Sequence, residues 1–415
     1  LKGQLGYPWV VLDSSTMAMR RVAEPQRLDL RRAGWCACIA ALAVTLIGCG
    51  GSGGGSSDET TTTATTTTTT TSTPEALYSC KSNLQFSGAK SIAGKGLCLD
   101  DTTFQQCVSN ITAVWPHTDH PVHSIRMFKP WQSDWGDDDA RRRAWGSLAA
   151  FVHQNNASVL MGTQVTCNDT DDDLVWNWTL ELMHVIGPDR VMAVALGNEM
   201  ELYFQKQGVP PACIEKLWGG GRYFDTLVRR VTDMDRTEAF RSIRFTSVFG
   251  GYSKAGFPFV DSPVSGVLTY LRKAWEKYQD RWVWSFNVYP FWDNTCAADF
   301  ASVPGGMADF RTRVSAVTKR KNDTMWMTET GWSSAPPQYY HEPCKGYCSP
   351  DRLQTYYESF LNWELGGPVD GNTDHAFYFT MRDARNFDIT ESFGLVETCQ
   401  NTSCKLQKIE ALVVV

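Results

Sequence analysis

The chain has 415 residues, a formal net charge of -6 at pH 7 and a sequence pI near 5.7. Nucleic-acid binding needs a basic surface that neutralises phosphates, so this acidic balance excludes nucleic acid as an expected partner. The chain is rich in aromatic residues, with 16 Trp, 14 Tyr and 20 Phe, which suits stacking on sugars and equally suits a large core.

The N-terminal 49 residues are expected to be a targeting segment. Arg31 and Arg32 precede an apolar run over residues 33–49, which is typical of a signal peptide or a short signal anchor. The end of the run also fits a lipoprotein box, in which Cys49 would carry the lipid. All three alternatives predict a secreted or cell-surface protein, and the last two predict a membrane tether at the N-terminus.

Residues 50–75 are expected to form a linker. They contain a Gly/Ser stretch and a threonine-rich run that ends at Pro74. Such a segment has almost no apolar surface to bury, so it cannot offset the entropy cost of ordering. We therefore expect a spacer that holds a folded domain away from a surface. The remaining 76–415 are long enough for one large α/β barrel.

Cysteine usage also favours export. Of 13 cysteines, three precede residue 50, and the other ten form an even set that suits disulfides. Close spacing suggests three small loops, closed by Cys98 with Cys107, Cys344 with Cys348, and Cys399 with Cys404. A metal site is not expected, because no second cysteine or histidine pair lies at ligand spacing. Sequons for N-glycosylation occur at Asn110, Asn156, Asn168, Asn177, Asn322 and Asn401.

Short β-rich runs alternate with amphipathic stretches through the rest of the chain. The predicted strands are 95–99, 123–128, 158–165, 191–196, 243–249, 282–288, 324–328 and 375–379. The helices predicted between them include 138–155, 171–186, 264–278 and 350–365, several opened by Asp or Ser. This alternation predicts a parallel sheet, and eight units predict its closure into a (β/α)8 TIM barrel of the α/β class.

Two of the predicted strands lead directly into a glutamate. Val191-Met-Ala-Val-Ala-Leu-Gly-Asn precedes Glu199, and Met325-Trp-Met-Thr precedes Glu329. The carboxyl ends of barrel strands meet at one face, where such barrels carry their active sites, so we expect the two carboxylates to face each other. Two facing carboxylates are the requirement of glycoside hydrolysis. Glu199 and Glu329 are therefore the predicted catalytic residues, and no cofactor is expected.

Neighbouring polar and aromatic residues are the expected substrate-binding residues. Asn198 can donate a hydrogen bond to a sugar 2-hydroxyl, an interaction that strengthens in the transition state. Asn287 and Tyr289 lie at the end of the sixth strand, where the phenol can hold the nucleophilic carboxylate in line. Trp292 and Trp332 offer faces to pyranose rings.

Other charged residues admit alternatives. Arg126, in the second strand, is expected at the site, with a barrel-interior ion pair as the alternative. Glu201 competes with the first glutamate but falls past its turn, where we expect a loop or rim charge. His117, His120 and His123 suggest a metal site, but they precede the second strand and so belong to the face opposite the catalytic end.

Five short segments between about residues 95 and 397 resemble a known family. Three of them are Gly197-Asn-Glu199, Asn287-Val-Tyr-Pro-Phe291 and Thr328-Glu-Thr-Gly-Trp-Ser-Ser334, and the others are Ile125-Arg-Met-Phe128 and Ser392-Phe-Gly-Leu395. They are similar to signatures of glycoside hydrolase family 17, the β-1,3-glucanases of clan A. The resemblance implies hydrolysis of β-1,3-glucan by a retaining double displacement. It further implies that Glu199 is the acid/base, with a raised pKa, and that Glu329 is the nucleophile.

The chain departs from this family in two places. Ser333 stands where the family has proline, and Phe379-Thr-Met-Arg-Asp-Ala-Arg385 replaces a Phe-Asp-Glu stretch, so we expect a different substrate cleft. Two other functions fit the same residues. A β-1,3-glucan transglycosylase would use both glutamates and exclude water from the acceptor side, whereas a noncatalytic carbohydrate-binding barrel on a surface stalk would need only the aromatics.

Overall fold

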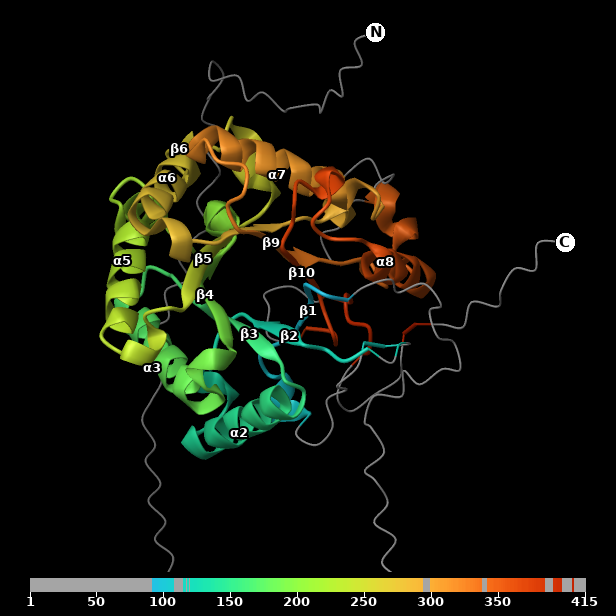
Figure 1. Ribbon diagram of the computed structural model, residues 1–415, viewed down its shortest axis with the longest axis horizontal. Coiled ribbons are helices and arrows are strands. Elements are labelled where there is room, and N and C mark those ends of the chain that lie inside the picture. The colour runs from blue at the N-terminus through green and yellow to red at the C-terminus, as the bar shows by residue number, and fades with distance from the viewer. Residues whose placement is uncertain are drawn as a thin grey trace, which may run out of the picture. The chain divides into compact units, whose positions relative to one another are not determined.

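The computed structural model describes residues 92–107, 115–116, 118, 120–293, 299–337, 342–384, 391–397 and 405–406. Eight of their strands form a closed parallel barrel (Figure 1). These are β1 (Lys95–Cys98), β2 (Ser124–Met127), β3 (Ser158–Thr163), β4 (Val191–Asn198), β5 (Arg244–Phe249), β8 (Trp284–Asn287), β9 (Met325–Thr330) and β10 (His375–Tyr378). Each pairs with the next along the chain, and β10 pairs with β1. The predicted TIM barrel is confirmed.

Helices surround the strands on the outside of the barrel (Figure 1). The longer ones are α2 (Asp138–Gln154), α3 (Asp169–Ile186), α5 (Arg222–Asp235), α6 (Val267–Tyr278), α7 (Ser302–Thr318) and α8 (Pro350–Asn362). Shorter elements lie in the connections: α1 (Thr103–Gln106), α4 (Pro211–Leu217), and an antiparallel ribbon of β6 (Asp261–Ser262) and β7 (Ser265–Gly266). The predicted helices that correspond to α2, α3, α6 and α8 are confirmed.

Local sequence explains where several helices begin. Asp137 accepts a hydrogen bond from the Ala140 amide at the start of α2, and Ser349 accepts one from Arg352 at the start of α8. These side chains satisfy amides that have no partner within the helix. Each helix then turns its apolar stripe inward, as α5 does with Leu227 and Val231, both almost fully buried.

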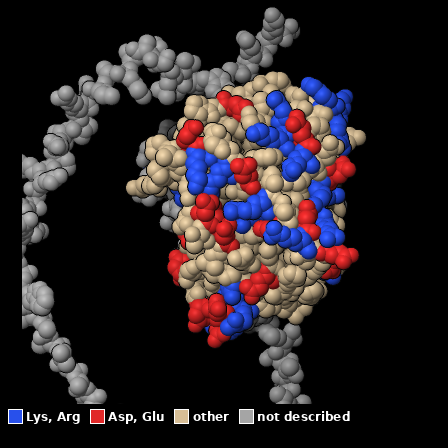
Figure 2. All heavy atoms as spheres, turned by 90° about the vertical axis from the view of Figure 1, so that its left-hand side faces the viewer, with Lys and Arg blue, Asp and Glu red and all other residues tan. Residues whose placement is uncertain are grey.

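Many charged side chains lie on the face of the helical layer that Figure 2 shows. On the side that carries α5, acidic and basic residues are intermingled rather than gathered into fields of one sign (Figure 2). The sequon residues Asn156, Asn168, Asn177 and Asn322 are all exposed. None of the helices in the described part of the chain is long and apolar enough to cross a membrane. The targeting segment (1–49) and the linker (50–75) lie outside the described residues, so the tether remains a prediction.

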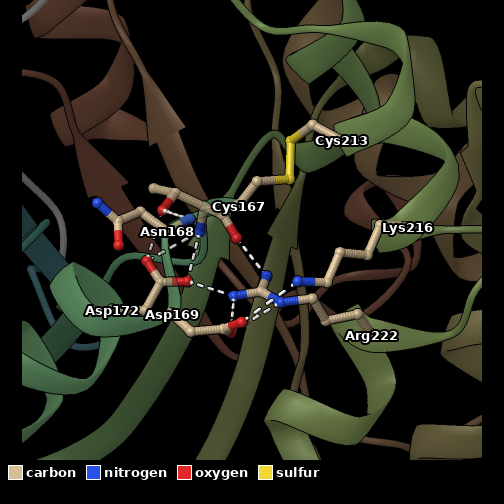
Figure 3. The surroundings of a disulfide bond; sticks show 8 residues. Cys167, Asn168, Asp169, Asp172, Cys213, Lys216 and Arg222 are labelled. Carbon is tan, nitrogen blue, oxygen red and sulfur yellow. Dashed lines mark hydrogen bonds and ion pairs between the residues drawn. A yellow bond between two sulfur atoms is a disulfide. The ribbon is translucent and has the colours of Figure 1, made fainter.

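One disulfide joins two described cysteines, Cys167 in the β3–α3 connection and Cys213 in α4 (Figure 3). Beside it, the Arg222 guanidinium at the start of α5 contacts both Asp169 and Asp172, the latter at 3.1 Å. The disulfide and these ion pairs tie the loop after β3 to the segment between β4 and α5.

The predicted small disulfide loops are wrong where the structure describes them. Cys98 and Cys348 are free thiols, whereas Cys107 and Cys344 each form other disulfides. Cys98 ends the barrel strand β1 and is buried, with its Sγ 3.5 Å from the Thr328 carbonyl oxygen. Its closeness in sequence to Cys107 therefore does not make the two cysteines a disulfide pair. The third pair, Cys399 with Cys404, lies outside the described residues.

The histidines considered for a metal site are only partly described. His117 lies outside the described residues. His123 is exposed just before β2, with its Nδ1 3.1 Å from the Asn155 carbonyl oxygen. Within the described ranges, no group of three or more His, Cys, Asp or Glu side chains is arranged to hold a metal ion.

Candidate active site

Glu199 and Glu329 lie close together at the C-terminal end of the barrel. Glu199 directly follows β4, and Glu329 is the second-last residue of β9. The side-chain amide of Asn287, at the end of β8, donates to Oε1 of Glu329 (2.9 Å) and to Oε1 of Glu199 (3.1 Å). The two oxygens are therefore no farther apart than 2.9 plus 3.1, or 6.0 Å. Residues 130 positions apart in sequence are brought to one point because β4, β8 and β9 are parallel and end at the same face.

The Glu329 carboxylate is buried and accepts three side-chain hydrogen bonds. Oε1 accepts from Arg126 Nη1 (2.7 Å) as well as from Asn287, and Oε2 accepts from the Tyr289 hydroxyl (2.9 Å). Arg126 is 1% exposed and Glu329 is 6% exposed. Such donors, one of them a guanidinium, suit a carboxylate that carries a negative charge. The predicted contact between Tyr289 and this carboxylate is present.

Arg126 lies beside Glu329 and forms with it the barrel-interior ion pair that was considered as the alternative. Besides Glu329, it contacts the Thr328 carbonyl oxygen (2.7 Å) and Asn198 Oδ1 (2.8 Å). Thr328 in turn donates from Oγ1 to Asn287 Oδ1 (2.9 Å). These contacts fix the two asparagine amides, so the side chains around the carboxylates form one connected network.

The backbone turns sharply at Glu199. This residue has φ 48°, in the left-handed region, and Gly197 has φ 73°. Left-handed backbone is unfavourable for a glutamate, by about 1–3 kcal/mol, and such outliers gather at functional sites. The Glu199 amide is held by the Val248 carbonyl of β5 (2.9 Å). Gly250, after β5, makes room for the side chain, because a Cβ there would lie 2.5 Å from Glu199 Oε1.

The electrostatic surroundings of Glu199 keep its carboxyl protonated to higher pH than usual. Burial, and then the negative charge of Glu329, raise the pKa of Glu199 to about 7, although Asn287 and Arg126 oppose the shift. Burial and the same negative charge also raise the pKa of Tyr289 well above its usual value, so the phenol remains a neutral donor to Glu329.

The two predicted tryptophan platforms differ in exposure. Trp292 is 41% exposed, and its ring packs edge-on against Phe291 at 4.9 Å. Trp332 is only 4% exposed; its ring lies against Phe291 and Tyr356, and its Nε1 donates to the Tyr347 carbonyl oxygen (3.0 Å). Little of the Trp332 ring is therefore open to a ligand.

Glu201 is not the rim charge that its sequence position suggested. Its side chain is fully buried, and its carboxyl group accepts a hydrogen bond from the Gly250 amide. Burial, with the charge of Glu199 as the next cause, raises its pKa well above the usual value. Burial thus disfavours the charged form of this carboxyl group.

Another acidic residue near the site, Glu391, was missed by sequence reasoning. Burial, followed by the charges of Glu329 and Glu199, raises its pKa to about 8. Its Oε2 is buried without a hydrogen-bond partner in the described part of the chain. The available signal was its position directly before Ser392-Phe-Gly-Leu395, a segment already singled out for its resemblance.

The unusual segment after β10 is largely buried over its described residues, 379–384. Arg382 is fully buried and forms an ion pair of 2.8 Å with Asp100, which is also fully buried and follows β1. It also donates to the hydroxyl groups of Thr102 and Thr103. Arg382 thus has a buried acidic partner just after the neighbouring strand β1.

No protein-family model and no curated protein matches the chain. Solved structures with a similar fold include a mutant of a β-1,3-glucanosyltransferase from Rhizomucor miehei in complex with laminaritriose (13% identity, 69% of this chain and 86% of that chain covered, TM-score 0.42). An endo-laminarinase from Formosa has 17% identity, coverage of 66% and 74%, and a TM-score of 0.41. A plant β-glucan endohydrolase has 15% identity, coverage of 74% and 97%, and a TM-score of 0.47. At identities this low, only the geometry of the site itself bears on function.

Proposed function

We propose that this protein is a retaining glycoside hydrolase that cleaves β-1,3-glucan, with Glu329 as nucleophile and Glu199 as acid/base. The observation that carries the proposal is the Asn287 amide that touches both carboxylates, which limits their facing oxygens to a separation of 2.9 plus 3.1, or 6.0 Å. Retaining enzymes hold the two groups about 5–5.5 Å apart, whereas inverting enzymes need roughly 6.5–9.5 Å to admit a water. The short separation favours the retaining reaction.

In the first step, a Glu329 oxygen attacks the anomeric carbon and the bond to the leaving oxygen breaks. Glu199 gives its proton to that oxygen, which leaves as a sugar hydroxyl. The raised pKa of Glu199, about 7, keeps that proton available near neutral pH. Tyr289 and Arg126 hold the Glu329 carboxylate in place for the attack.

In the second step, water attacks the anomeric carbon of the glycosyl ester, the bond from this carbon to the Glu329 oxygen breaks and releases the carboxylate, and Glu199 accepts the water's proton. Once Glu329 is esterified, its negative charge is gone, and one of the causes that raised the pKa of Glu199 disappears. The pKa of Glu199 therefore falls at the stage when this residue must act as a base.

Substrate binding is proposed for the residues that surround the pair. The oxygen of the Asn198 amide accepts from Arg126, so its NH2 group is the part available to a sugar 2-hydroxyl. Trp292 offers the exposed aromatic surface, and Trp332 supports it through the Phe291 ring between them. The β-1,3 linkage rests on the motif resemblance, and secretion or a cell-surface tether rests on residues 1–49.

The test is product analysis of the protein, expressed with its disulfides formed, on laminarin, mixed-linkage glucan and cellulose. We expect short β-1,3 oligosaccharides from laminarin, each released first with the β anomer because the mechanism retains configuration. Products longer than the substrate would favour the transglycosylase. Folded protein that leaves all three glucans intact would contradict the proposed substrate.

A further inference from the structure

A pocket lies on the outside of the barrel, where α5 and α6 begin. Its volume is about 270 Å³. Its lining combines the aromatic residues Trp218, Tyr223 and Phe224 with the polar residues Asp261, Ser262 and Lys273. Pockets for complete small molecules occupy roughly 300–1,000 Å³, so this one suits a short segment of a longer ligand.

Aromatic rings form one wall of the pocket and hold each other in place. Tyr223 and Tyr270 are stacked at 4.2 Å, and Trp218 packs edge-on against both, at 5.2 and 6.3 Å. Trp218 and Phe224 are half-buried, so part of each ring still faces outward. Rings fixed by other rings offer contact area to a ligand at little cost in conformational entropy.

The polar residues that line the pocket carry no net charge. Asp261 is held by hydrogen bonds from Thr269, at 3.1 Å from the amide and 2.6 Å from the hydroxyl. Lys273 extends over the Phe224 ring, with Nζ 5.7 Å from its centroid. One carboxylate and one ammonium group balance, and the surrounding face mixes both signs (Figure 2). These features favour a neutral ligand with hydroxyl groups over a polyanion or a basic peptide.

The pocket lies at the catalytic end of the barrel. Its Tyr223 hydroxyl donates to the carbonyl oxygen of Leu196 in β4 (2.8 Å), three residues before Glu199. The Tyr270 hydroxyl lies 2.6 Å from Ser247 Oγ in β5. The aromatic residues Tyr223 and Tyr270 thus contact β4 and β5, the strand that precedes Glu199 and the strand whose Val248 carbonyl binds the Glu199 amide.

We propose that this pocket is an accessory binding site for a segment of a neutral glucan chain, distinct from the catalytic centre. The identity of the sugar rests on the proposed function. A polymer held at two linked sites gains affinity because binding at one raises its effective concentration at the other. The pocket therefore matters for long chains and not for substrates too short to reach it.

The experiment measures laminarin binding by retardation in native gels, using full-length protein with the Glu329→Ala change so that the glucan is not consumed. Three further changes are compared: Trp218→Ala, Lys273→Ala and Gly266→Met. The last one fills the pocket without removing core atoms, because a Cβ at Gly266 would lie 3.7 Å from the Trp218 ring, an ordinary contact. We expect each change to weaken laminarin binding about fivefold or more.

The same three changes, made in the active enzyme, should leave kcat/KM for laminaritriose within about twofold of the unchanged enzyme, because the trisaccharide needs only the catalytic cleft. Lys277→Ala is the matched control: Lys277 is also on α6 and lies over a ring, 5.6 Å from the Tyr278 centroid, but outside the pocket. It should bind laminarin normally.

Unchanged laminarin binding by folded Gly266→Met and Lys273→Ala overturns the accessory site and leaves the proposed function intact. Equal losses on laminaritriose and laminarin also overturn it, since the changes would then act through the cleft. If the unmodified enzyme fails to hydrolyse laminarin, the proposed function fails instead. Retardation that the pocket changes abolish would still support the site in that case.

Discussion

Glu199 and Glu329 end two strands of one barrel, but they lie in different surroundings. Glu329 continues the extended backbone of β9 and accepts hydrogen bonds from a guanidinium, an amide and a phenol. Glu199 sits in a left-handed turn, and its one side-chain donor among the described residues is Asn287, which it shares with Glu329. The two residues are of the same type, so their surroundings make the difference: Glu329 is held by three donors, whereas the pKa of Glu199 is raised to about 7.

The largest loss of activity is expected when Glu329, the carboxylate with the three donors, is replaced. Glu329→Ala should lower kcat on laminarin by roughly 10⁴-fold or more, because no other group forms the covalent intermediate. Added azide should partly restore turnover by occupying the vacated space as a nucleophile, with inverted product. Glu276→Ala, which removes an exposed carboxylate on α6, should leave activity unchanged. Absence of azide rescue in a folded variant would argue against Glu329 as the nucleophile.

Glu199→Gln should lower kcat/KM on laminarin by roughly 10²–10⁴-fold, the usual contribution of general acid catalysis. The loss should be much smaller on aryl β-glucosides of laminari-oligosaccharides with good leaving groups, because these need little protonation. Comparing both substrates in one steady-state series measures the difference. Equal losses on both would assign the acid to another residue, with Glu201 and Glu391 as the nearest candidates.

Tyr289→Phe tests how far the donors to Glu329 distinguish it from Glu199. The change removes the 2.9 Å hydrogen bond to Oε2 and keeps the ring in place. A hydrogen bond to a charged group contributes about 1.5–3 kcal/mol, so kcat should fall roughly 10- to 100-fold. Thermal unfolding should show that the fold is retained. A variant with full activity would mean that Arg126 and Asn287 suffice to hold the nucleophile.

The pH dependence measures the raised pKa of Glu199 directly. The active form has this carboxyl protonated, and its fraction falls as pH rises through about 7. Above that value kcat/KM on laminarin should therefore fall about tenfold per pH unit. The residual activity of Glu199→Gln should lack this decline. A decline centred well below pH 6 in the unmodified enzyme would show that Glu199 is not perturbed as the structure indicates.

Much of the fold was predictable because its signals are local. Each barrel strand is a short apolar run, each long helix repeats its apolar residues on one face, and these patterns need no knowledge of distant parts. The eight strand positions and four named helices therefore agree with the structure. The approach of Glu199 and Glu329 was predictable for a related reason, since parallel strands of a closed barrel end at the same face.

Contacts between side chains from distant segments were not predictable in the same way. Cys167 pairs with Cys213 across 46 residues, because the loop after β3 and helix α4 meet in the folded barrel. Glu201 looked like a rim charge because nothing nearby in sequence indicates that the Gly250 amide covers it.

By itself, the sequence determined the order of strands and helices, the closure of the barrel and the two strand ends that carry glutamates. These follow from hydrophobic periodicity and from the geometry that parallel strands share. The tertiary structure alone decided which donors surround each carboxylate, which acidic side chains are buried, and which aromatic rings remain open. Those properties depend on burial and on distances of a few ångströms between segments far apart in the chain, and no local pattern encodes them.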